Sequence, residues 1–140
     1  MGIDLKGFRA ARARFSADLQ RDVKHIVVGS AVELRDNFAR ANPVDTGRSA
    51  ASWNASARRL NAFKQPETYY GPGPERISAG KIDVDSWRLG DAVHVSNGQE
   101  YIWALETGHS KQAPSGFVRI GLDSYAQGVL HAHRTSSPSR

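Results

Sequence analysis

One triplet in the sequence has the residue types of an aspartic protease. Asp45, Thr46 and Gly47 stand in that order, and such an enzyme pairs two carboxylates that share a proton. The protease triplet normally follows an apolar strand, whereas this one follows Asn42-Pro43-Val44, after a predicted helix. We therefore favour a turn in which Asp45 or Thr46 caps a short helix.

A second pair has the spacing of di-iron ligands. Glu106 precedes His109 by three residues, as in carboxylate-bridged iron proteins, but such a site needs further carboxylates and an unbroken helix. Gly108 lies between the two and is predicted to end the helix. The glycine- and proline-rich stretch 71–74 is not followed by the Gly-Lys-Ser/Thr of a phosphate-binding loop. We expect no catalytic, metal-binding or cofactor-binding residues, and a protein that is not an enzyme.

The elements around these residues belong to a single domain. The chain has 140 residues, of which 39% are hydrophobic and 24% charged, which is ordinary for a globular protein. It has no cysteine, and no apolar run approaches the length of a membrane span. Its net charge of +5 comes from residues 1–60, which hold 11 Lys/Arg against 6 Asp/Glu. Such a basic half suits DNA or an acidic protein surface, but a charge excess of this size is more often simply the solvated face of a helix.

The first expected element is a long helix over residues 4–41. Gly29 and Ser30 are a weak point where a kink is plausible, and Asn42-Pro43 ends the helix. One small domain cannot cover every face of so long a helix, so a partner subunit is expected to cover part of it. The helical period is carried by Leu5, Phe8, Phe15, Leu19, Val23, Ile26, Val27, Leu34 and Phe38.

Shorter elements follow. Residues 50–60 are expected to run into a strand, 61–80 to form a long loop, 81–97 a β-hairpin turning at Gly90-Asp91, and 99–107 a short helix. Residues 117–131 are predicted to form a short strand and then a helix, and 133–140 a disordered tail. The predicted fold is α+β: a long N-terminal helix packed on a small antiparallel sheet, with short helices and a C-terminal helix, in one domain over residues 1–132.

The three tryptophans lie within periodic elements. Trp53 and Trp87 are predicted to be core residues. Trp103 lies off the stripe formed by Tyr101, Ile102 and Leu105, so it is either an exposed interface anchor or a third core residue. In the long loop, Pro72 and Arg76 are further candidates for an interface.

Two segments together resemble a known family. Residues 42–53 (NPVDTGRSAASW) and 97–119 (NGQEYIWALETGHSKQAPSGFVR) are similar to the tail-completion and neck proteins of tailed phages, the family that includes the lambda minor tail protein Z-like proteins. The chain departs from the family pattern at Ser49, usually Leu, and at Ile102, often a small residue. The motif residues are Asp45, Thr46, Gly47, Arg48, Tyr101, Glu106, Gly108, His109, Ser110, Pro114, Gly116 and Arg119.

The resemblance implies a structural virion protein made in the host bacterial cytoplasm and built into the tail or neck. Its expected partners are further copies of itself in a hexameric ring, the phage connector, and the tail-terminator or tail-tube proteins. Non-specific contact with channel DNA is one role for the basic half. Neither a membrane nor a small-molecule substrate is expected.

Two alternatives stay open: a DNA-binding regulatory protein, and the neighbouring head-tail connector or tail-terminator subunit. In the favoured interpretation Asp45, Arg48, Glu106 and Arg119 make structural ion pairs or capping hydrogen bonds.

Overall fold

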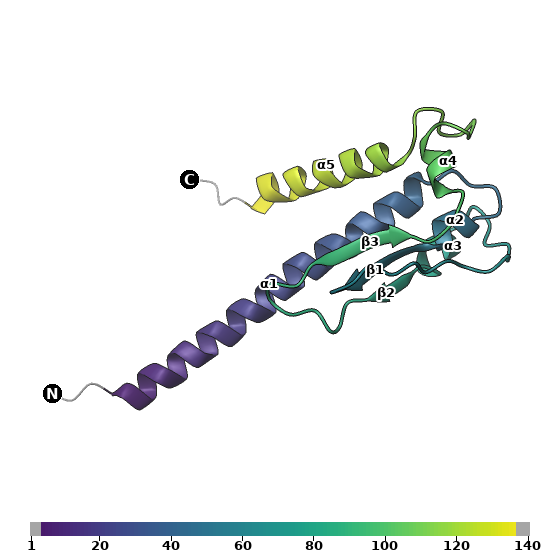
Figure 1. The fold of residues 1–140 in the computed structure, drawn as a ribbon. Coiled ribbons are helices and arrows are strands. Elements are labelled where there is room, and N and C mark those ends of the chain that lie inside the picture. The colour runs from purple at the N-terminus through teal and green to yellow at the C-terminus, as the bar shows by residue number, and fades with distance from the viewer. Residues whose placement is uncertain (1–3, 137–140) are drawn as a thin grey trace.

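The computed structural model describes residues 4–136, with side chains as far as His131, and has the expected α+β architecture (Figure 1). A long N-terminal helix packs on a small sheet, and a second long helix ends the described chain. The elements in order are α1 (Leu5–Ala41), α2 (Arg48–Ala51), β1 (Trp53–Ala57), α3 (Glu75–Ser78), β2 (Lys81–Asp83), β3 (Val93–Asn97), α4 (Ile102–Glu106) and α5 (Val118–Ser136).

Helix α1 runs without a break past Gly29, so the suggested kink is absent. It begins where the Asp4 side chain accepts a hydrogen bond from the Gly7 amide at 2.9 Å, which satisfies one of the free amides of a helix start. It ends at Asn42, whose extended backbone is what a following proline favours. The predicted bounds of this helix are confirmed to within a residue.

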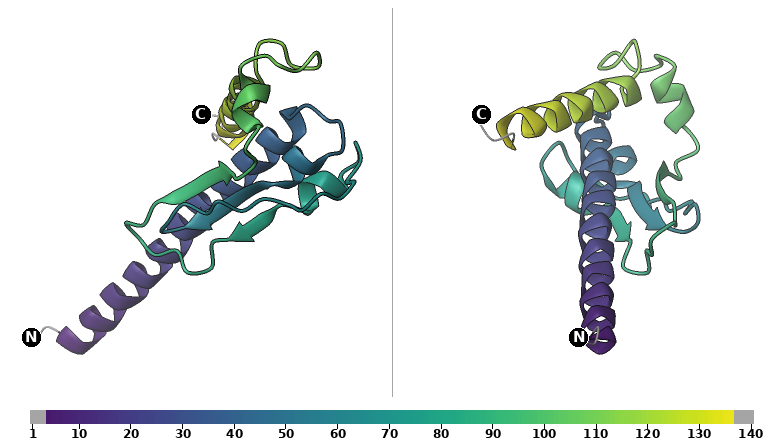
Figure 2. Two further views of the ribbon diagram at one scale, coloured as in Figure 1. Left: turned by 45° about the vertical axis from the view of Figure 1, so that its right-hand side comes forward. Right: turned by 90° about the vertical axis from the view of Figure 1, so that its left-hand side faces the viewer.

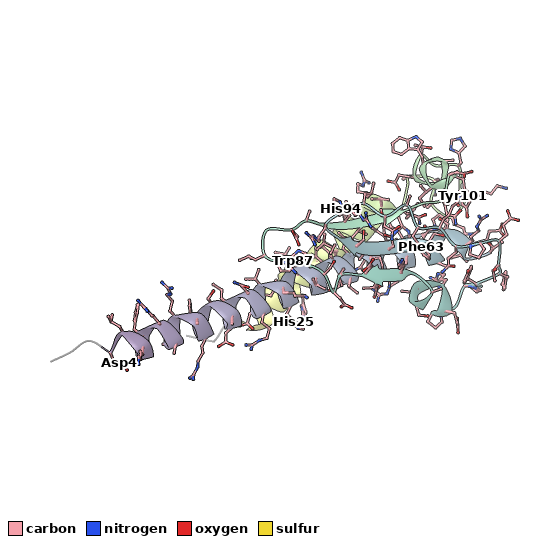
Figure 3. The ribbon with its side chains drawn as sticks, turned by 60° about the horizontal axis from the view of Figure 1, so that its bottom comes forward. Asp4, His25, Phe63, Trp87, His94 and Tyr101 are labelled. Carbon is pink, nitrogen blue, oxygen red and sulfur yellow. The ribbon has the colours of Figure 1, made fainter. Side chains whose placement is uncertain are left out.

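The two halves of α1 have different surroundings. Residues 4–22 are exposed throughout and project beyond the rest of the molecule (Figures 1 and 3). We call this segment the arm, and the rest of the described chain the body. Toward the other end of α1, Arg35, Phe38 and Ala39 are buried, where the helix packs on the sheet and on α5.

The sheet is mixed, and the predicted hairpin is wrong. The strand order is β2-β1-β3, with β1 antiparallel to β3 and parallel to β2. Strand β1 therefore lies between the two strands that were expected to pair with each other, and all of its residues are buried. The segment between β2 and β3 instead folds around the buried Trp87, whose indole nitrogen donates to the Asp91 carbonyl at 2.9 Å.

The core lies where α1, β1 and α5 meet. Phe38 and Trp53 have ring centroids 4.8 Å apart, and Trp53 meets Phe117 edge-on at 6.2 Å. Helix α5 crosses α1 at Gly121, where a Cβ would come within 2.6 Å of the Phe38 ring (Figure 2). Trp53 and Trp87 are confirmed as core residues.

The C-terminal segment differs from its prediction. Residues 118–136 form one helix, so the short strand expected near residue 117 does not exist. The helix also includes residues 133–136, so the disordered tail predicted from residue 133 is wrong over these four residues. Residues 137–140 of that tail lie outside the described part of the chain.

Candidate assembly site

The two segments that carry the family resemblance meet in space. The Gln112 side chain spans the gap between them: its amide oxygen accepts from the Val44 backbone nitrogen at 2.9 Å, and its amide nitrogen donates to the Val44 carbonyl at 2.7 Å. Nearby, the Asn97 side chain donates to the Ser49 carbonyl at 2.8 Å. We call residues 42–53 together with 97–118 the junction.

A buried amide organises the centre of the junction. Asn42 is 2% exposed, and its side-chain oxygen accepts hydrogen bonds from the Ser49 hydroxyl at 3.1 Å and from the Trp53 indole nitrogen at 3.0 Å. Because a buried polar atom without a partner costs about 1–3 kcal/mol, these bonds fix the end of α1 against α2 and β1.

The Asp-Thr-Gly-Arg turn packs closely against the long loop. Gly47 has φ +79, and a Cβ on it would lie 2.5 Å from the Gly71 carbonyl oxygen. The Thr46 carbonyl accepts from the amides of Tyr70 and Gly71 at 2.7 and 3.1 Å, which ties the turn to the long loop. Gly47 occupies the cap position of α2, and the Thr46 hydroxyl accepts from the Arg48 amide at 3.4 Å. The predicted side-chain cap is therefore weak at Thr46 and absent at Asp45.

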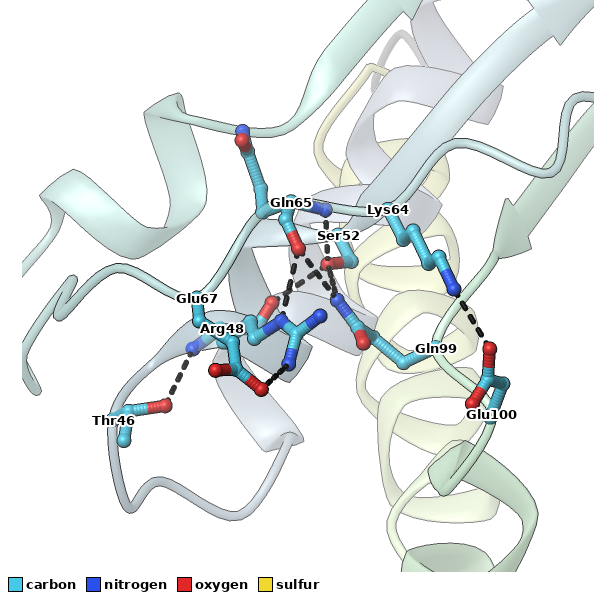
Figure 4. Close-up of polar contacts among 8 residues, drawn as sticks. All are labelled: Thr46, Arg48, Ser52, Lys64, Gln65, Glu67, Gln99 and Glu100. Carbon is cyan, nitrogen blue, oxygen red and sulfur yellow. Dashed lines mark hydrogen bonds and ion pairs between the residues drawn. The ribbon is translucent and has the colours of Figure 1, made fainter.

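Arg48 holds the long loop from the other side (Figure 4). Its Nε donates to the Gln65 carbonyl at 2.9 Å, and its Nη1 forms an ion pair with Glu67 at 3.2 Å. Glu67 is 88% exposed, so the carbonyl bond contributes more than the screened ion pair. The structural role predicted for Arg48 is confirmed.

A second layer of the same network centres on the buried side chains of Ser52 and Gln99. The Ser52 hydroxyl donates to the Arg48 carbonyl at 2.7 Å and accepts from the Gln65 amide and from Gln99 Nε2 at 2.9 and 2.7 Å (Figure 4). At its edge, Lys64 contacts Glu100 at 2.8 Å, and this hydrogen bond and charge lower the pKa of the Glu100 carboxyl. Burial raises the pKa of the neighbouring Tyr101 hydroxyl.

The Glu106 side chain caps the N-terminal end of the last helix, α5. Its Oε2 accepts from the backbone amides of Phe117 and Val118, both at 2.8 Å, and these amides lie at the start of α5. Two glycines with positive φ shape the loop between Glu106 and Phe117: Gly108 (φ +93) and Gly116 (φ +85). A Cβ on Gly108 would lie 2.5 Å from the Pro114 carbonyl oxygen, and a Cβ on Gly116 would lie 2.6 Å from the Glu106 carbonyl oxygen. The capping role predicted for Glu106 is confirmed. The short helix predicted over residues 99–107 ends within a residue of its expected end but begins only at Ile102.

The remaining motif residues divide into two groups. His109 contacts the Ala104 carbonyl at 3.0 Å through Nδ1 and so covers the end of α4. The Ser110 hydroxyl accepts a hydrogen bond from the backbone N–H of Gln112 at 3.2 Å. Asp45 and Arg119 are exposed and form no hydrogen bond or ion pair with any residue that the structure describes. The structural contacts predicted for these two side chains are therefore wrong.

The candidate interface residues also differ from one another. Trp103 is 73% exposed, beside an apolar hollow of about 380 Å³ lined by Trp53, Val95 and Ile102, so it is not a third core residue, and its role as an interface anchor stays a prediction. Pro72 is exposed. Arg76 is half-buried and donates to the carbonyls of Pro72 and Gly73, which makes it an internal clamp of its own loop.

Sequence reasoning missed the amide and hydroxyl side chains that build the junction. Asn42, Ser52, Gln99 and Gln112 make its central hydrogen bonds, yet none was singled out. All four lie within the two segments that carry the resemblance, which was the one available signal. Uncharged polar residues attract little notice in a sequence because their partners are distant in the chain.

A hollow lies beside the Asp-Thr-Gly-Arg turn of the junction. The hollow beside the turn has a volume of about 270 Å³, and Asp45 is the one carboxylate among its lining residues. Within residues 4–136 there is no cluster of three or more His, Asp or Glu side chains that could hold a metal ion. In the same range, no helix combines the length and apolar character needed to cross a membrane.

In comparisons with known proteins, no family model, no curated protein and no solved structure matches this chain. The resemblance to the phage family therefore rests on the residues quoted above.

Proposed function

We propose that this chain is a non-enzymatic structural subunit of a tailed-phage virion. In this proposal it is a tail-completion or neck protein that forms a ring at the head-tail junction and joins the tail tube to the connector. The observation that carries the proposal is the arm, a helix segment that its own body leaves uncovered although it carries large apolar side chains.

The exposure of these side chains favours an assembly role. Phe8 is 63% exposed and Phe15 is 69% exposed. Fully burying one such side chain is favourable by about 1.5–3 kcal/mol, a gain that the isolated chain forgoes. A subunit that is completed by its neighbours would recover that gain on assembly.

The arrangement of surfaces suits a ring. The arm projects from one end of the molecule, while Trp103 on α4 lies toward the other end (Figure 1). Subunits in a ring use two different surfaces, one for each neighbour. The ordered junction would then present α4 and its loop in a constant shape.

Binding to phage tails tests the proposal. Tails assembled without this protein are mixed with the purified chain, separated by sedimentation, and assayed for bound copies and for joining to heads. We expect a constant number of copies on each tail and restored joining. Binding to heads alone would assign the chain to the connector, and binding to neither would contradict the proposal.

A pair of variants locates the contact. Trp103→Ala is expected to lower tail binding or ring formation by about tenfold or more, because exposed aromatic anchors dominate interfaces. Leu60→Ala removes another exposed apolar side chain, 67% exposed on the loop after β1, and serves as the matched control. Equal binding by both variants and the unaltered chain would remove Trp103 from the interface.

A DNA-binding regulator is a second candidate. Lys6, Arg9, Arg12 and Arg14 are exposed on the arm and form no ion pair with the described residues. Phosphate contacts release counterions, so DNA binding through these residues would weaken steeply with salt. A steep salt dependence together with no binding to tails would replace the virion proposal with this one.

A further inference from the structure

The exposed apolar residues of α1 form a seam with coiled-coil spacing. Steps of three and four residues alternate along the helix without interruption, as they do at the a and d positions of a heptad repeat. Two of the positions are ionic, and the apolar ones are between 50% and 69% exposed. The seam consists of Leu5, Phe8, Arg12, Phe15, Leu19, Asp22 and Ile26.

The body does not obstruct this seam. The body approaches α1 at the end of the arm, where Ala17 and Gln20 line a hollow with Trp87, and just beyond the arm, where Lys24 donates to the Asp85 carbonyl at 2.8 Å. At 3.6 residues per turn, positions 17, 20 and 24 lie on the side of the helix opposite to the seam. The seam is therefore open along its length to another helix.

The two ionic positions select the orientation of that helix. Arg12 has no ion pair among the described residues, and Asp22 contacts only its neighbour Arg21, at 3.4 Å. A parallel second copy would place Arg12 against Arg12 and Asp22 against Asp22, and like charges in a seam repel.

An antiparallel second copy pairs six of the seven seam positions favourably, and Leu5 alone lies opposite a residue outside the seam, Gly29. When Phe15 lies opposite Leu19 of the second copy, the same register sets Phe8 opposite Ile26 and Arg12 opposite Asp22. The two-fold axis repeats each of these contacts. Each charge within the apolar seam thus meets the opposite charge, which such a charge requires when it is removed from water.

We propose that the free protein is a dimer in which the arms of two copies form an antiparallel coiled coil with Arg12 of each copy paired to Asp22 of the other. A two-fold contact closes at two copies and cannot by itself propagate a ring. The dimer is therefore a property of the free chain and goes beyond the proposed place in a virion. Entry into a ring through the arm would require the pair to separate.

Charge-swap variants test the pairing. Light scattering over a concentration series is expected to give twice the chain mass of 15.3 kDa for the unaltered protein. Arg12→Asp and Asp22→Arg each set like charges together in the antiparallel register, so each is expected to weaken dimerisation by about 100-fold. Combining the two substitutions restores opposite charges and is expected to restore the dimer.

The matched control is Arg14→Asp, which makes the same charge change off the seam and is expected to leave the dimer intact. Circular dichroism checks that all variants keep their helix content. A monomer at every concentration for the unaltered chain would overturn the proposal, as would charge variants that dimerise normally or a double variant that does not recover.

A distance measurement tests the orientation independently. The chain has no cysteine, so Lys6→Cys introduces a single site for a spin label. In the antiparallel register the two labels lie roughly 33 Å apart along the helix axis, at about 1.5 Å per residue. Labels within about 20 Å of each other would indicate parallel helices and overturn the proposal. None of these measurements uses a phage component, so their outcome is separate from that of the tail-binding experiment.

Discussion

The junction and the arm carry similar residue types in opposite settings. In the junction, polar side chains such as Asn42, Ser52 and Gln99 are at most 4% exposed, and each has two or more hydrogen-bonding partners. On the arm, polar and apolar side chains alike face solvent. Its ion pair between Arg21 and Asp18, at 3.0 Å, joins side chains that are 70% and 60% exposed.

The buried hydrogen bonds of the junction stabilise the fold, whereas the exposed side chains of the arm remain available to a partner. Buried polar groups stabilise a fold only when all of them are paired, so the junction is complete in the single chain. Exposed ion pairs contribute about 0–1 kcal/mol, and exposed apolar residues contribute nothing until they are covered. Substitutions in the junction should therefore change stability, and substitutions on the arm should change association.

The largest effect is expected from two matched phenylalanines. Phe117→Ala removes a fully buried ring and should lower the free energy of unfolding by about 3–5 kcal/mol. Phe15→Ala removes an exposed ring and should change it by less than about 0.5 kcal/mol when measured in the monomeric Arg12→Asp background. Urea denaturation measures both. A large loss with Phe15→Ala in that background would mean that the body already covers the arm.

A second test uses two glycines with positive φ. Gly47→Ala places a Cβ against the Gly71 carbonyl and is expected to cost about 2–3 kcal/mol in stability. Gly90 has φ +94 and open space around it, so Gly90→Ala should cost only the backbone strain, about 1 kcal/mol. The difference in thermal midpoint between the two isolates the close approach of the turn to the long loop. Equal midpoints would show that the turn can move away from that loop.

Removing the cap of α5 should have a somewhat smaller effect. Glu106→Ala leaves the amides of Phe117 and Val118 without their acceptor and is expected to cost about 2 kcal/mol. Glu106→Gln keeps one oxygen acceptor and should cost less. Chemical denaturation compares them with Glu33→Ala, an exposed glutamate of α1. A Glu106→Ala protein as stable as the Glu33→Ala control would contradict the capping role.

The smallest effect concerns the exposed edge of the junction. Lys64→Met should raise the pKa of Glu100 back toward 4.5, because the Lys64 hydrogen bond and charge are the two largest causes that lower it. Since the folded-state pKa is the lower one, the stabilisation is present above the ordinary value and is lost as the pH falls through the folded-state pKa. NMR titration of the Glu100 carboxyl measures the shift, with Lys111→Met as the control. An unchanged pKa in Lys64→Met would exclude the contact in solution.

Local patterns predicted the helices better than the sheet. The bounds of α1 and the end of α4 were confirmed, because helical period and a glycine after a helix are properties of neighbouring residues. The hairpin over residues 81–97 was wrong, because alternation in two segments cannot show that β1 lies between them. The short strand predicted at the start of residues 117–131 was also wrong, because a short apolar run by itself fits a strand and a helix equally well.

The candidate site was predicted in part. Arg48 and Glu106 were expected to make structural contacts and do so, whereas Asp45 and Arg119 do not. Glu106 reaches amides eleven and twelve residues away, and Gln112 reaches Val44 across 68 residues. No pattern of neighbours encodes such distances.

The sequence alone determined the α+β class, the long helix and the coiled-coil spacing of its seam, because each depends on the order of nearby residues. Only the tertiary structure decided which part of that helix the body covers, which strands pair, and which polar groups are buried. These outcomes depend on contacts between residues far apart in the chain, and their energies arise only when burial removes those residues from water.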